Sequence, residues 1–230
     1  IRVAPVRIRH YGYLKRTVQE KDKARRNLGL LLKEKEERPA DSFLYYNLGV
    51  EYLRLGEYRT ALDCFDRAEA GLDWRSAFAP SLVLKKADCL RAMGRVEEAL
   101  AYLERCYRTY PDFTDLYYQV GLLRLEQGNF SGAAEAFRRC LLLGEPPRHY
   151  PSQEGVGGSL ALTALGQVYE DRLQEEEALS FYCQALAANP RDLRPLAAII
   201  RLLLAGHSEE EAVAYLDAHF DLTTPLANLE

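Results

Sequence analysis

Few residues of this chain have the types and spacing that catalysis or metal binding would require. The four histidines share no metal-ligand spacing; they are His10, His149, His207 and His219. Paired carboxylates such as Asp63 and Asp66, and the run Glu209–Glu211, fit solvent-facing sides of helices. The sequence has no Asp-x-Asp motif in a nucleotide fold, no phosphate-binding glycine loop and no general base with a partner. The chain alone is therefore expected to be non-catalytic, with no cofactor and no metal.

The cysteines also indicate a structural role. Their number is odd and their spacing unpaired; they are Cys64, Cys89, Cys106, Cys140 and Cys183. Four of them lie on the apolar sides of expected helices, where a small hydrophobic residue is wanted. This scatter argues against a disulfide framework and for a reducing compartment. With no signal peptide and no apolar run of membrane-spanning length, we expect a cytoplasmic protein.

Pairs of short amphipathic helices must position any functional side chains of this chain. Residues 45–68 show this best, because two apolar faces at helical spacing are separated by Gly56. The first face contains Tyr45, Leu48, Gly49 and Tyr52, and the second contains Tyr58, Ala61, Leu62, Phe65 and Ala68. Gly49 and Ala61 are expected to be small because the two helices touch there. Such a pair cannot bury its apolar face alone and so predicts neighbours of its own kind.

The same pair recurs along the chain. Its first small position falls at Gly49, Ala87, Gly121, Gly166 and, more weakly, Ile200. Its second falls at Ala61, Ala99, Ala133, Ala178 and Ala212. Both series have intervals of 38, 34, 45 and 34 residues. Two markers that keep one spacing indicate a shared helix pair.

These positions and the interval of about 34 residues resemble the tetratricopeptide repeat (TPR) family. The resemblance implies an all-α fold, a right-handed superhelix (α-solenoid) of antiparallel helix pairs over residues 41–222. The expected repeats are 42–75, 80–113, 114–147, 159–192 and a degenerate 193–222, followed by a tail at 223–230. The fourth repeat has Leu173 where the turn glycine belongs, and Ala212 and Leu216 remain in the fifth. Two insertions are expected, residues 72–79 with the only tryptophan and a mobile surface loop at 145–158.

The amino-terminal part has a different character. Residues 1–13 alternate apolar and basic side chains, which predicts a strand left over from a preceding domain. Residues 14–40 predict a basic helix whose apolar stripe caps the first repeat; the stripe is Leu14, Thr17, Val18, Ala24, Leu28, Leu31 and Leu32. Residues 1–38 carry 12 Lys and Arg against 5 Asp and Glu, although the whole chain has a net charge of -4.

The family pattern also implies a concave groove lined by the first helix of each repeat. The expected lining is Phe43, Tyr46, Val50, Leu53, Arg54, Leu84, Asp88, Arg91, Tyr118, Leu122, Leu125, Glu126, Thr163, Gln167, Glu170 and Asp171. This groove would be aromatic at one end and acidic at the other. It suits an extended peptide or helix of basic character better than a free carboxylate, since Val50 replaces a carboxylate-clamping residue. Alternatively, the aromatic residues only pack against the neighbouring helix.

A second resemblance concerns the segment Arg9-His10-Tyr11-Gly12-Tyr13 and the later Arg26-Asn27-Leu28. Followed by the repeats, they resemble the end of a family 2 glycosyltransferase domain and its carboxy-terminal repeat region. The resemblance implies that His10 faces a divalent metal or a nucleotide-sugar diphosphate in the parent protein, favoured by nearby basic residues. The repeats would then hold an acceptor protein or peptide, or form a homodimer.

Two other hypotheses stay open. The chain could be a free-standing TPR adaptor that recruits a protein partner. Alternatively, the basic segment 2–33 could bind an anionic membrane surface or nucleic acid. The acidic remainder of the chain and the scarcity of aromatic residues among those charges count against nucleic acid.

Overall fold

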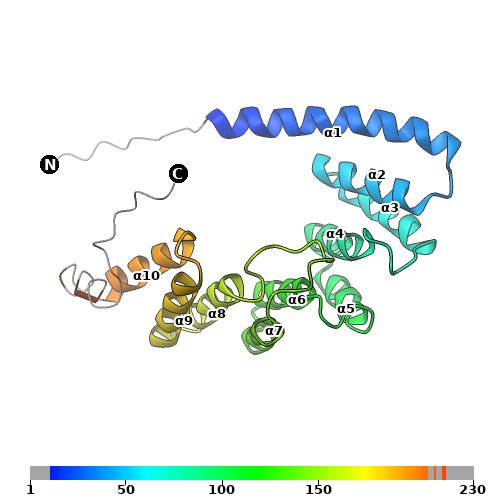
Figure 1. Cartoon of the computed structure of the whole chain (residues 1–230). Helices are drawn as coiled ribbons and strands as arrows, with labels where there is room; N and C mark the ends of the chain where they lie inside the picture. Colours follow the sequence, from blue (N-terminus) through cyan, green and yellow to red (C-terminus); the bar gives the residue numbers. More distant parts are fainter. Residues whose placement is uncertain (1–10, 207–209, 211–213, 216–230) are drawn as a thin grey trace. The chain divides into compact units, whose positions relative to one another are not determined.

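The structure, a computed structural model, describes residues 11–206, 210 and 214–215, with side chains from residue 21 onward. These residues form ten α-helices and no strand (Figure 1). The chain divides into two compact units, Ile1–Tyr102 and Leu103–Glu230, with the boundary inside α5. The all-α fold class of paired helices is confirmed. None of the described helices has the length and apolar content to cross a membrane.

The first unit contains the long amino-terminal helix and the first repeat. Its helices are α1 (Tyr11–Glu37), α2 (Ser42–Leu55), α3 (Tyr58–Ala70), α4 (Ala79–Ala92) and the start of α5 (Val96–Cys106). Asp41 caps α2, because its carboxylate accepts from the backbone N–H groups of Phe43 at 2.8 Å and Leu44 at 3.0 Å. Gly56 ends α2 in the left-handed conformation, with φ of 82°, and reverses the chain into α3.

The predicted strand at residues 1–13 is wrong for its last three positions. Tyr11, Gly12 and Tyr13 begin α1, while residues 1–10 lie outside the described part. A long helix continues the 3.6-residue period that starts at Leu14, and its first turn extends back over these residues. α1 packs on α2, as predicted for a capping helix.

The apolar stripe of α1 is narrower than predicted. Ala24 is 1% exposed, and Asn27 Nδ2 donates to Glu51 Oε1 at 3.1 Å across the contact with α2. Leu28 and Leu31 are half-buried, but Leu32 is exposed, so its assignment to the stripe is wrong. A single neighbouring helix covers only a narrow part of the surface of α1, and Leu32 lies beyond it.

The second unit continues the pairing. Its further helices are α6 (Thr114–Glu126), α7 (Phe130–Leu143), α8 (Ser159–Asp171), α9 (Glu175–Ala188) and α10 (Leu193–Gly206). α6 pairs with α7 and α8 with α9, while α7–α8 and α9–α10 contacts stack one pair on the next. Phe137 and Leu165 centre one core cluster, and Tyr182 and Ile199 centre the next. The markers Ala212 and Leu216 of the fifth repeat lie outside the described residues.

Both insertions form loops, which was predicted for the second one; the last residue of the first, Ala79, begins α4. Residues 71–78 connect α3 to α4, and residues 144–158 connect α7 to α8. The second loop, which we expected to be mobile, is instead tied to the start of α6. The ring of Tyr150 stacks on Phe113 at 4.5 Å, and its hydroxyl donates to Asp112 at 2.7 Å. The buried carboxylate of Asp115 accepts from the Ser152 hydroxyl and the Gln153 backbone N–H, and its burial raises its pKa.

Candidate protein-binding faces

In the first unit, the predicted groove residues lie on α2 and α4, two first helices that contact each other; we call their outward sides the α2–α4 face. The predicted lining residues are all half-buried or exposed, namely Phe43, Tyr46, Val50, Leu53, Arg54, Leu84, Asp88 and Arg91. By contrast, Leu48 and Leu82 on the same helices are 1% and 0% exposed and belong to the core. Helical periodicity thus separates core from lining positions.

An aromatic cluster forms the most exposed apolar part of this face. Phe43 is 52% exposed, and its ring centroid lies 5.2 Å from that of Phe78 and 6.1 Å from that of Tyr46. Tyr46 also lies 5.2 Å from Phe78 and 6.3 Å from Phe65. Contacts within the protein therefore cover much of the Tyr46 ring, as the alternative interpretation expected. About half of the Phe43 side chain stays accessible to a partner.

Phe78 is a contributor that the sequence reasoning missed. It lies in the 71–78 loop, immediately before α4, where no helical period marks it. The available signal was an aromatic residue directly ahead of a helix start that carries Pro80 in its first turn. The first insertion therefore extends the aromatic cluster, in addition to lengthening the connection.

The charges of this face are partly satisfied within the unit. Arg54 forms an ion pair with Glu51 at 2.9 Å and keeps 54% of its side chain exposed. Burial raises the pKa of Asp88, while the positive charges of Lys85 and Arg91 act in the opposite direction. Asp88 is thus a partly desolvated carboxylate with cations on either side.

In the second unit, α6 and α8 form the corresponding face. They contact each other and carry the half-buried or exposed positions Tyr118, Leu122, Leu125, Glu126, Thr163, Gln167, Glu170 and Asp171. Tyr118, Leu122 and Leu125 pack against the core cluster around Phe137. Burial raises the pKa of Tyr118, and the nearby Arg194 acts against that rise. This face therefore combines aromatic and aliphatic side chains with polar groups.

The predicted acidic end of the groove is partly neutralised. Glu170 accepts from the Tyr182 hydroxyl at 2.8 Å and from Arg201 Nη2 at 3.0 Å, so its charge is paired. Asp171 is exposed and accepts from Gln167 Nε2 at 2.7 Å. Arg201, one helix pair further along the chain, reaches Glu170 and compensates its charge.

The candidate metal residues do not come together in the described part of the chain. His10, His207 and His219 lie outside it, and His149 packs against Tyr150 with ring centroids 4.1 Å apart. Within that part, no three His, Cys, Asp or Glu side chains are grouped to hold a metal ion. All five cysteines are free thiols.

The fold is that of a helical-repeat protein, in which helix pairs stack one on the next. Residues 42–69 and residues 84–149 each match models of the tetratricopeptide repeat, so the chain carries such repeats in both units. The resemblance inferred from the small residues is confirmed for the repeats.

One curated relative is the protein-lysine N-methyltransferase SMYD4 of Pongo abelii. It is 33% identical over 78 residues, which is 33% of this chain and 10% of the relative. The chain therefore matches only about a tenth of that protein's length.

Solved structures resemble the whole fold. PilF of Pseudomonas aeruginosa superposes with a TM-score of 0.63 at 20% identity, covering 91% of this chain and 87% of PilF. MamA superposes with a TM-score of 0.60 at 20% identity, covering 82% of this chain and 99% of MamA. YrrB, described as a TPR protein with an unusual peptide-binding site, gives 0.57 at 22% identity over 77% and 84%. At these identities the likeness concerns the fold.

Proposed function

We propose that this chain is a non-catalytic protein-interaction scaffold that holds a peptide or helix of a partner on its first-helix faces. The observation that carries the proposal is the half-exposed Phe43, which stands in an aromatic cluster on the α2–α4 face. An exposed aromatic ring supported by others provides a rigid contact at low entropic cost. The peptide-binding site in the description of YrrB is in keeping with this function.

The chemistry of the two faces suggests what the partner presents. Phe43 and Leu84 offer an apolar surface for a large side chain in the first unit. Asp171 gives the α6–α8 face an exposed carboxylate that suits a lysine or arginine of the partner. A bulky apolar residue of a partner is therefore the proposed ligand of the α2–α4 face, and a basic residue is the proposed ligand of the α6–α8 face.

The test is a displayed peptide library selected against the chain, followed by affinity measurement of the enriched peptides. Phe43→Ala should weaken binding about tenfold or more if the α2–α4 face is used. Tyr118→Ala tests the α6–α8 face in the same way. Tyr58→Ala is the matched control, since Tyr58 is 38% exposed on the second helix α3. Equal affinity of all three variants for the selected peptides would contradict binding on the first-helix faces.

The parent protein of this scaffold and its location in the cell remain predictions. The relatives named above include no glycosyltransferase, so the family 2 glycosyltransferase parent, with its nucleotide sugar, divalent metal and the role of His10, stays a hypothesis beside the free-standing adaptor. A coding sequence upstream that encodes a nucleotide-sugar domain with paired aspartates would support the first setting; an unrelated domain would contradict it. A cytoplasmic location and a homodimer are likewise proposals, the former supported by the five free thiols.

A further inference from the structure

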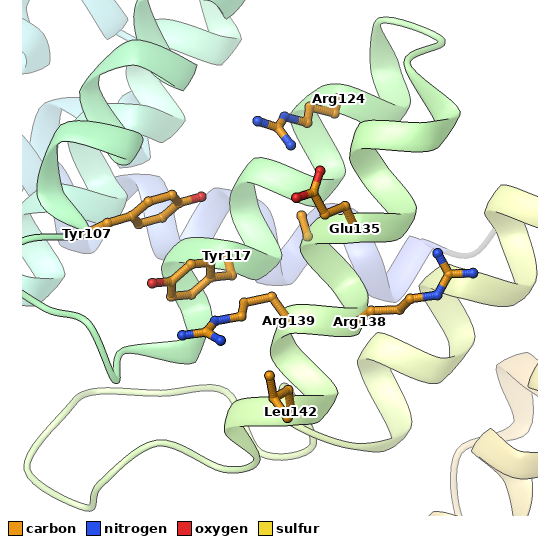
Figure 2. Close-up of a pocket in the computed structure, with 8 residues that line it drawn as sticks. Tyr107, Tyr117, Arg124, Glu135, Arg138, Arg139 and Leu142 are labelled. Atoms are coloured by element: carbon orange, nitrogen blue, oxygen red, sulfur yellow. The ribbon is translucent and has the colours of Figure 1, made fainter.

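A pocket of about 430 Å³ opens in the second unit at residues outside the predicted groove. α7 forms most of its wall, with α6 and the turn after α5 completing it (Figure 2). The residues around it are Tyr107, Tyr117, Arg124, Glu135, Ala136, Arg138, Arg139 and Leu142. Three arginines and two tyrosines in one small hollow indicate recognition of a negative group.

Arg139 makes a cation–π contact with one ring of a stacked tyrosine pair. The ring of Tyr117 stacks on Tyr107 with centroids 4.2 Å apart and planes 12° apart. The guanidinium carbon of Arg139 lies 5.7 Å from the Tyr117 centroid, and Figure 2 shows Tyr117 between Tyr107 and Arg139. A cation–π contact attracts the guanidinium to the ring without using its N–H donors in a hydrogen bond.

The other two arginines already have acceptors. Arg124 donates to Glu104 at 2.7 Å and to the Gly132 carbonyl at 3.2 Å. Arg138 donates to the Tyr169 hydroxyl, and Figure 2 shows its side chain directed away from the two tyrosines. Among the described residues, Arg139 forms neither an ion pair nor a hydrogen bond with another side chain. Its donors are therefore the ones that a ligand would meet.

We propose that this pocket binds a carboxylate side chain of a partner protein through Arg139. The planar guanidinium matches a carboxylate with two parallel hydrogen bonds. Leu142 is 74% exposed beside it and would contact an apolar residue next to the acidic one in the partner. This site is distinct from the first-helix faces, so it would add a second contact to the scaffold.

The charge balance favours a single carboxylate over a phosphate or an anionic membrane. Once Arg124 is paired with Glu104, the remaining charged groups of the lining are two arginines and the one carboxylate of Glu135. Phosphate groups and anionic lipid surfaces are typically bound by several basic side chains acting together. Burial raises the pKa of Tyr107, so its hydroxyl in the lining stays protonated.

The experiment is a peptide array probed with the 230-residue chain. The array fixes Glu, Gln or Lys at a central position and varies its neighbours among Ala, Leu, Phe and Tyr. The strongest binder is then resynthesised with a fluorescein label and titrated by fluorescence anisotropy. We expect Glu to bind about tenfold more tightly than Gln, and more tightly still with Leu or Phe beside it.

Variants locate the binding. Arg139→Ala should lower the affinity for the Glu peptide about tenfold. Glu135→Gln should raise this affinity by removing a negative charge. Arg108→Ala is the matched control, because Arg108 is exposed and does not line the pocket. Thermal unfolding of each variant checks that the fold is kept.

Four results would overturn the proposal. The first is an array without preference for Glu over Gln, and the second is unchanged affinity in Arg139→Ala. The third is displacement of the peptide by millimolar inorganic phosphate but not by acetate, which would identify a phosphate site instead. Loss of binding in Phe43→Ala or Tyr118→Ala alone would assign the peptide to the first-helix faces and likewise contradict it.

Discussion

Gly49 lies directly against the ring of Phe65. A Cβ atom on Gly49 would come within 2.5 Å of Phe65 Cε1, closer than real side chains approach. Gly121 meets Phe137 at the same 2.5 Å, and Gly166 faces Tyr182 in the same way. In each pair a fully buried ring on the second helix occupies the space that a side chain on the first helix would need. This contact sets how closely the two helices of a repeat can approach.

Gly49→Ala is therefore expected to destabilise the fold by about 1–3 kcal/mol, because the added methyl group must push a buried ring aside. Chemical denaturation followed by circular dichroism measures the change. Gly29→Ala is the control: nothing lies within 4 Å of its added Cβ in α1, so helix propensity should stabilise it by up to about 1 kcal/mol. Equal effects of the two substitutions would contradict the role given to the Gly49–Phe65 contact.

Leu173 replaces a turn glycine and adopts the left-handed conformation, with φ of 59°. Gly56, Gly94 and Gly128 hold the same kind of position with φ between 70° and 82°. The Leu173 side chain is 86% exposed, so little packing compensates the strain. The left-handed conformation is about 1–2 kcal/mol less favourable for leucine than for glycine. Part of this difference is offset, because glycine loses more conformational entropy on folding.

Leu173→Gly should consequently raise the free energy of unfolding by roughly 0.5–1 kcal/mol. Differential scanning calorimetry would show the gain as a higher melting temperature. The reverse substitution Gly128→Leu should lower it. A less stable Leu173→Gly protein would mean that the leucine makes a favourable contact after all.

Asp88 gives a prediction about pH. Burial raises its pKa above the ordinary 3.8, so the folded protein holds this proton more tightly than the unfolded chain does. The free energy of unfolding therefore falls as the pH rises from about 3.8 through the higher pKa that Asp88 has in the folded protein. Asp88→Asn should melt at a higher temperature than the wild type at pH 7, and the difference should disappear at pH 3. A constant difference across this range would exclude titration of Asp88 as the cause.

The thiols should differ sharply in reactivity. Burial raises the pKa of both Cys89 and Cys140 to about 12, and both side chains are 0% exposed. Cys183 is half-buried and its sulfur lies 3.8 Å from the Tyr215 hydroxyl. Because the thiolate is the reactive form, N-ethylmaleimide at pH 8 should modify Cys183 first and leave Cys89 and Cys140 unmodified until the protein unfolds. Peptide mass spectrometry after timed quenching would measure this order.

Much of the fold was predictable because it depends on local pattern. The small residues at Gly49, Gly121 and Gly166 and the buried rings opposite them recur at fixed spacing, so neighbouring helices could be paired without a structure. The separation of core and lining positions followed from the same period. The strand predicted for residues 11–13 was wrong, because a period-two pattern over so few residues cannot outweigh an adjoining long helix.

The candidate sites were only partly predictable, since they combine residues without a common period. Phe78 joins Phe43 from an insertion, and Arg201 neutralises Glu170 from a later helix pair. The pocket at Arg139 depends on Tyr107 and Tyr117 stacking on each other, which no spacing rule indicates. Each of these contacts joins residues that are distant in the chain or lie in loops.

The sequence by itself determined the repeating helix pair, because apolar period, small contact residues and turn glycines are local properties of the chain. Tertiary structure decided which charges remain available and which aromatic rings stay exposed. Those properties depend on neighbours brought close by packing: Arg201 pairs with Glu170, whereas Arg139 lies over the Tyr117 ring and forms no hydrogen bond with another side chain of the described residues.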